Sequence, residues 1–192
     1  VLAGGFAIMS AAFSELGISG MTTADGALRE GVLYDLLGRF HRHDMREATV
    51  RQFMRRYQVD PVQAGRVEML SLDLLRQLPE LLPTEPKASL QRLSWAARLH
   101  EVGLSIAHGG YHKHSAYIIE NADMPGFSRK EQGRLALLML AQRGSLAKVA
   151  GAVTGGEEWA QILALRLGVL FHRSRTEPSL PEIRLEWLGN GF

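Results

Sequence analysis

The sequence predicts a mainly α-helical protein, and three observations support this. Apolar residues recur three and four positions apart through most of the chain, which is the spacing that places them on one face of a helix. Residues that cap helix starts precede several of these segments, and glycine or proline turns separate them. We therefore expect a multi-helix domain that buries the apolar helix faces against one another.

The first part of the chain predicts a small mixed unit. Apolar spacing predicts one helix over residues 5–17 and another over about 28–37. Residues 18–24 between them are β-like, and Asp25 and Gly26 form a turn. So small a unit cannot bury a core alone.

Residues 38–46 are predicted to be a linker that begins a strongly basic stretch. Six arginines and only two acidic residues lie between positions 39 and 56. A row of arginines suits successive phosphates, but for Arg51, Arg55 and Arg56 we favour a solvated helix face. Phosphate binding is the interpretation we favour for four residues at the start of the stretch: Arg39, His41, Arg42 and His43.

The remaining predicted helices follow one another with short loops. They cover about 60–78, 88–103, 112–122, 128–142, 145–153 and 157–171. Asp60 followed by Pro61 is a favourable helix start, and Ser128 with Glu131 has the spacing of a capping box. The last helix is apolar on nearly all sides, which predicts a central position in the domain.

Composition excludes several classes of protein. The chain has 192 residues, of which 46% are hydrophobic, enough for one domain or for one domain plus a fragment of another. It has no cysteine, and no apolar run of transmembrane length or signal peptide is evident. A net charge of +2 is too small to indicate nucleic-acid binding. We expect a location in the cytoplasm or at the membrane surface.

The sequence at both ends of the chain predicts that it is a piece of a longer protein. The chain begins with Val1 rather than methionine, directly in a helical pattern. Residues 183–188 alternate as a strand would, and the Gly-Asn-Gly sequence at 189–191 is typical of a hairpin turn. We therefore expect residues 176–192 to begin a β-hairpin that is incomplete.

The most unusual stretch is a polar cluster between two predicted core helices. Four of the seven histidines lie in residues 100–120, around a Gly109-Gly110 turn. His100 and Glu101 at a helix end, with His112 and His114 at the next helix start, could bind a divalent metal, as in helical phosphohydrolases of the HD type. Alternatively, Lys113 between two histidines at a helix start favours phosphate. Structural capping is a third possibility, and the residues alone leave all three open.

Two blocks of sequence resemble a known family. Residues 100–103 (HEVG) with 112–119 (HKHSAYII), and residues 24–35 (ADGALREGVLYD), are similar to the C-terminal region of the exopolyphosphatase and guanosine pentaphosphate phosphohydrolase family. The resemblance implies three parts: the end of an actin-like domain over 1–37, an HD-like helical domain over 38–175, and a tail over 176–192.

The resemblance also implies that the HD-type metal site is degenerate. Gln63 stands where the first histidine is expected, His100 and Glu101 replace the His-Asp pair, and Val169 stands where a late aspartate is expected. A neutral amide and a valine are poor ligands. We therefore expect no metal and no catalytic residue in this chain, and no activity from it alone. A surviving metal-dependent phosphohydrolase site formed by His100, Glu101, His112 and His114 is the alternative.

The resemblance implies that this region has a binding and assembly role. The helical region of an exopolyphosphatase would hold inorganic polyphosphate and contribute to a homodimer, while absent actin-like domains use Mg²⁺ to release terminal phosphate. A guanosine pentaphosphate phosphohydrolase is the alternative whole protein. The residues that we expect to bind polyphosphate are Arg39, Arg42, His43, His112, Lys113 and His114.

Overall fold

A computed structural model describes residues 2–20, 44–84, 86–176 and 182–189. The chain divides into two compact units, residues 1–37 and 38–192, which are considered separately. No helix in these described segments is both long and apolar enough to cross a membrane.

The first unit contributes one described helix, α1 (Leu2–Leu16). Its apolar side chains, including Phe6, Ile8 and Leu16, are largely exposed within this unit. Residues 18–20 are described and do not form a strand. The rest of the expected strand and the predicted second helix lie outside the described residues, so an actin-like remnant is not shown.

The second unit is mainly helical in its described residues before the tail. Its α-helices are α3 (Met45–Arg56), α4 (Pro61–Arg76), α5 (Lys87–Leu99), α6 (Tyr111–Asn121), α7 (Arg129–Ala141) and α8 (Gly156–Phe171). Short 3-10 helices connect them at Pro79–Leu81, Val102–Ser105 and Leu146–Lys148. The expected helix over 145–153 is therefore only the last of these short turns.

Local sequence explains where these helices begin. The Asp60 carboxylate accepts hydrogen bonds from the backbone N–H groups of Val62 and Gln63 at the start of α4. Ser128 and Glu131 form the expected reciprocal capping box at the start of α7. Such caps satisfy N–H groups that lack a partner within the helix.

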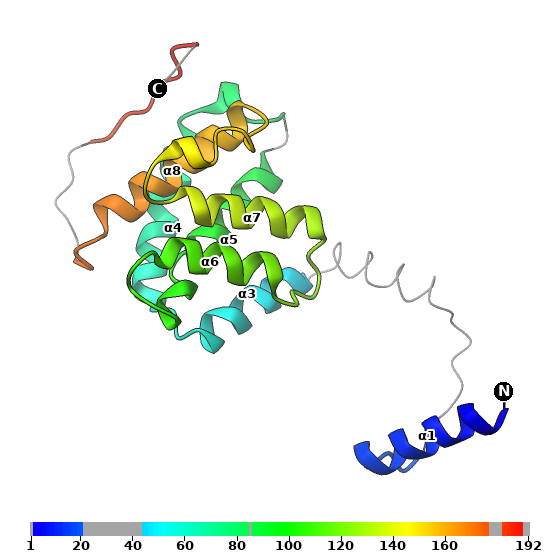
Figure 1. The fold of residues 1–192 in the computed structure, drawn as a ribbon. Coiled ribbons are helices and arrows are strands. Elements are labelled where there is room, and N and C mark those ends of the chain that lie inside the picture. Colours follow the sequence, from blue (N-terminus) through cyan, green and yellow to red (C-terminus); the bar gives the residue numbers. More distant parts are fainter. Residues whose placement is uncertain (1, 21–43, 85, 177–181, 190–192) are drawn as a thin grey trace. The chain divides into compact units, whose positions relative to one another are not determined.

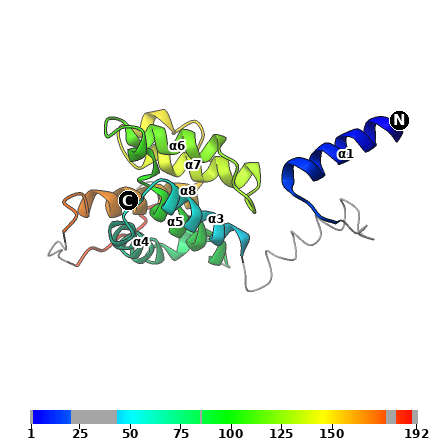
Figure 2. The same ribbon diagram turned by 90° about the horizontal axis from the view of Figure 1, so that it is seen from below.

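The helices of the second unit form two layers (Figures 1 and 2). Helices α6 and α7 lie side by side in one layer, and α3, α4, α5 and α8 form the other. Helix α5 contacts α3, α4, α7 and α8. Helix α8 contacts α4, α5 and α7, so the last helix shares the central place with α5, although Leu170 on one side of it is exposed.

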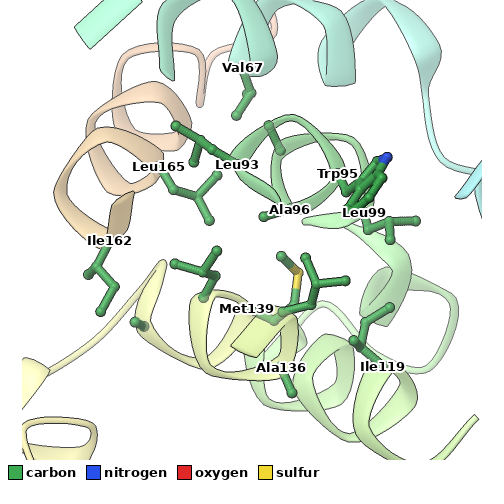
Figure 3. Close-up of a cluster of buried hydrophobic side chains, with 14 of the residues drawn as sticks. Val67, Leu93, Trp95, Ala96, Leu99, Ile119, Ala136, Met139, Ile162 and Leu165 are labelled. Atoms are coloured by element: carbon green, nitrogen blue, oxygen red, sulfur yellow. The ribbon is translucent and has the colours of Figure 1, made fainter. Parts of the chain in front are cut away.

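The core lies around α5 (Figure 3). Leu93, Ala96 and Leu99 of this helix are fully buried, and they face Met139 of α7 and Leu165 of α8. Burial of one such leucine contributes about 2 kcal/mol. This core fixes the C-terminal end of α5, which carries His100 and Glu101.

Residues 182–189 are described as an extended tail with no strand pairing. The Leu185 N–H donates to Gln77 Oε1 at 2.8 Å, and Gln77 Nε2 donates to the Ile183 carbonyl at 3.2 Å. Ile183, Leu185 and Trp187 pack against the core. The alternating apolar residues that predicted a strand therefore pack one side of the tail against the helical domain.

Candidate functional site

A cavity of about 610 Å³ lies where the ends of several helices meet. Its walls come from the start of α4, the end of α5 and the segment after it, the turn after α7, and the C-terminal half of α8. The four positions compared with an HD-type metal site all line it: Gln63, His100, Glu101 and Val169. The fold thus brings together residues that are more than 100 positions apart in the chain.

His100 is fixed by hydrogen bonds at the end of α5. Its Nδ1–H donates to the Ala97 carbonyl at 2.6 Å, which leaves Nε2 as the nitrogen without that proton. The His100 carbonyl accepts from Ser115 Oγ at 3.0 Å and from Gln142 Nε2 at 2.9 Å. Burial lowers the pKa of His100, so the ring is neutral at neutral pH.

The Glu101 carboxylate forms an ion pair with an arginine, so it is not available as a metal ligand. Arg175 Nη2 lies 2.7 Å from Glu101 Oε1, and Arg175 Nη1 lies 3.2 Å from Asp60 Oδ2. Glu101 is only 9% exposed. A buried carboxylate needs a positive partner, and the Arg175 guanidinium supplies that charge.

The donor set does not fit a divalent ion. A catalytic metal site requires about three protein ligands with an open position. Across the described segments, no group of three or more histidine, cysteine, aspartate or glutamate side chains is placed to share an ion. Gln63 offers only an amide, whose Nε2 donates to the His172 carbonyl at 2.7 Å, and Val169 offers no donor.

Sequence reasoning missed the residues that give this cavity its charge. Four arginines line it: Arg143, Arg166, Arg173 and Arg175. Arg166 Nη1 donates to the Ala141 carbonyl at 2.6 Å, and the Arg143 guanidinium lies 5.7 Å from the centre of the Tyr111 ring. The only signal was that Arg143, Arg173 and Arg175 follow the C-terminal ends of α7 and α8, where positive charge is favourable. Arg166 lies within α8 and gave no such signal.

The residues predicted to bind polyphosphate divide into two groups. Arg39, Arg42 and His43 lie outside the described residues. His112, Lys113 and His114 begin α6, and none of them lines the cavity. Lys113 is exposed and His114 half-buried, whereas His112 is buried and its Nδ1 has no hydrogen-bond partner among the described residues.

Lys148 lies close to His112, and Gly144 lies next to both side chains. A Cβ atom at Gly144 would lie 3.3 Å from Lys148 Nζ and 3.7 Å from His112 Nε2, so the two side chains share one small region. Burial and the charges of Lys148, Lys113 and Arg143 lower the pKa of His112 to about 4. We call Lys113, His114 and Lys148 the basic surface.

The fold and the cavity define a helical domain that keeps a histidine–acid pair at a helix junction without a fitting set of metal ligands. Residues 45–186 match the family model described as Ppx/GppA phosphatase, domain III. The chain belongs to the Ppx/GppA phosphatase family.

Relatives with assigned names agree with this family. The chain is 39% identical over 188 residues to a guanosine-5'-triphosphate,3'-diphosphate pyrophosphatase of Pseudoalteromonas translucida, and the match covers 96% of the chain. It is 37% identical over 190 residues to the protein of the same name from Aeromonas hydrophila. In both cases the chain spans 38% of the relative's length.

Proposed function

We propose that this chain is the C-terminal region of a phosphohydrolase that cleaves phosphoanhydrides, and that its helical domain holds a phosphate chain rather than cutting it. Family membership supports the reaction class. A role without catalysis is supported by the ion pair of Glu101 with Arg175, because the guanidinium occupies the carboxylate that an HD-type site would use for a metal.

The observation that carries the binding role is the basic surface. Lys148 and His112 both lie beside Gly144, and Lys113 and His114 follow His112 on α6. Burial is the main reason why the pKa of His112 falls to about 4, and the positive charges of Lys148, Lys113 and Arg143 lower it further. Such a concentration of positive charge is unfavourable unless solvent or an anion offsets it. A flexible polyanion such as inorganic polyphosphate could contact all three cations at once, and repeated contacts of this kind increase affinity.

The names of the relatives favour a second candidate for the substrate of the whole protein. They are called guanosine-5'-triphosphate,3'-diphosphate pyrophosphatases, whereas the sequence reasoning placed inorganic polyphosphate first. Both molecules carry linear phosphate groups, so the basic surface suits either one. The homodimer, and Mg²⁺ in the part of the protein that carries out hydrolysis, stay predictions.

The four lysines of the chain give a matched test. Lys113→Ala/Lys148→Ala removes two charges of the basic surface, whereas Lys87→Ala/Lys130→Ala removes two exposed charges elsewhere. Titration of the 192-residue chain with long-chain polyphosphate at low salt should give at least about tenfold weaker binding for the first variant only. Wild-type binding should weaken with added salt.

Two outcomes would reject the binding role. One is the absence of any polyphosphate binding by the wild-type chain at low salt. The other is equal loss of affinity in the two lysine variants, since this would show only a general effect of net charge.

A further inference from the structure

Two hydrogen-bond acceptors in the cavity wall have no partner in the part of the chain that the structure describes. The Gln63 and Gln142 side chains are 2% and 3% exposed, and neither Oε1 atom accepts a hydrogen bond from the described residues. Their Nε2 groups donate to the His172 and His100 carbonyls at 2.7 and 2.9 Å. The amides cannot be reversed without losing those bonds, because a carbonyl accepts and cannot donate.

An unsatisfied buried acceptor costs about 1–3 kcal/mol. Two of them in the wall of one cavity point to a ligand that carries N–H or O–H donors. His100 Nε2 adds a third acceptor on the same wall, because Nδ1 carries the proton of the neutral ring. An inorganic phosphate ion alone offers few donors, so it does not complement this side of the cavity.

Another part of the wall is apolar. It consists of the side chains of Leu104, Leu163, Leu167 and Leu170, together with the Tyr111 ring. Leu170 is 59% exposed, so this apolar part of the wall is open to solvent. Ligand cavities of this size generally combine such apolar walls with a few polar groups that orient the ligand.

The charged residues of the cavity favour an anion. Among the described residues, four arginines line the cavity, whereas Glu101 is the one acid in its wall and is paired with Arg175. Arg143 and Arg173 are exposed residues of the wall. Guanidinium groups bind phosphate through two parallel hydrogen bonds.

We propose that this cavity is a nucleotide-binding site. The base of a nucleoside phosphate would lie against the leucines and donate hydrogen bonds to Gln63 Oε1 and Gln142 Oε1. Its phosphate would bind Arg143 and Arg173. Lys113, His114 and Lys148 do not line the cavity, so binding there does not depend on a phosphate chain at the basic surface.

Guanosine 5'-monophosphate is a suitable probe because its base has neighbouring imino and amino donors, and ribose 5-phosphate is the control that lacks a base. Calorimetric titration of the 192-residue chain should show binding of the nucleotide, with ribose 5-phosphate at least about tenfold weaker. Arg173→Ala should weaken nucleotide binding about tenfold. Arg55→Ala, which removes an exposed arginine outside the cavity, should not.

The Lys113→Ala variant separates this site from the basic surface, because Lys113 is exposed and does not line the cavity, whereas Lys148 donates to the carbonyl of Arg143. Lys113→Ala should bind guanosine 5'-monophosphate as tightly as the wild-type chain does, even where polyphosphate binding is weakened. The proposal is overturned if the nucleotide does not bind, if ribose 5-phosphate binds equally well, or if Arg55→Ala weakens binding as much as Arg173→Ala does.

Discussion

His112 is a buried histidine that is kept neutral by its surroundings. Burial and the neighbouring cations lower its pKa to about 4, whereas a histidine in an unfolded chain has a pKa near 6.5. Between these two values the unfolded chain binds the proton more tightly than the folded chain does. His112 therefore has no effect on stability above about pH 6.5 and destabilises the fold as the pH falls towards 4.

This predicts a pH-dependent loss of up to roughly 3 kcal/mol from His112. The free energy of unfolding, measured by urea denaturation from about pH 7 to pH 4, should fall less steeply in His112→Gln than in the wild-type chain. Burial also lowers the pKa of His100. His100 therefore destabilises the fold at low pH in both the wild-type chain and His112→Gln. The exposed His108 provides the control, and an equal change of slope in His108→Gln would contradict the prediction.

The ion pair of Glu101 and Arg175 permits a second prediction. Arg175→Ala leaves a carboxylate that is only 9% exposed without its guanidinium partner. Because the Arg175 side chain is itself 44% exposed, we expect a loss of about 1–3 kcal/mol rather than the larger cost of a fully buried pair. Adding Glu101→Gln should restore most of the loss.

Denaturation of the two single variants and the double variant measures this coupling. Arg184→Ala is the control, since Arg184 and Glu182 form a pair that is about three-quarters exposed and such pairs contribute little. Additive losses in the double variant would show that Glu101 does not depend on Arg175.

At the scale of the helices, glycine residues distinguish close crossings from open surfaces. A Cβ at Gly168 of α8 would collide with Ser71 Oγ and lie 3.1 Å from the Val67 carbonyl oxygen of α4. A Cβ at Gly133 of α7 would have no neighbour within 4 Å. The two helical glycines therefore predict opposite effects of the same substitution.

Gly133→Ala should stabilise the chain by about 0.5–1 kcal/mol, because alanine loses less backbone entropy in a helix. Gly168→Ala should destabilise it by about 1–3 kcal/mol, because α4 and α8 must move apart. Thermal unfolding of both variants checks the pair. Stabilisation by Gly168→Ala would show that α4 and α8 do not approach as closely as described.

Helix starts were the best-predicted elements, and the tail was the poorest. Caps such as Asp60 and Ser128 act through neighbouring backbone groups, so a short stretch of sequence contains the whole interaction. The tail depends on a distant residue, because Gln77 binds both Ile183 and Leu185. Period-two alternation alone cannot distinguish such a segment from a paired strand.

At the scale of the whole chain, the cavity was only half visible in the sequence. Comparison with HD-type sites identified Gln63, His100, Glu101 and Val169, which all line it. Gln142 and the arginines come from turns and helix ends with no shared motif. Their common function depends on how α4, α5, α7 and α8 pack. Short sequence patterns do not predict this packing.

That packing leads to a prediction about metal ions. Arg175 forms ion pairs with Glu101 and Asp60, which connect the segment after α8 to the end of α5 and the start of α4. The Arg175 guanidinium thus lies beside the Glu101 carboxylate, where a metal ion would otherwise bind. A ligand stabilises a protein only if it binds the folded state more tightly. Adding Mn²⁺, or removing metals with a chelator, should therefore change the midpoint of thermal unfolding by less than about 1 °C, whereas Arg175→Ala should lower it by several degrees. A rise with Mn²⁺ that disappears in Glu101→Gln would instead reveal a working metal site.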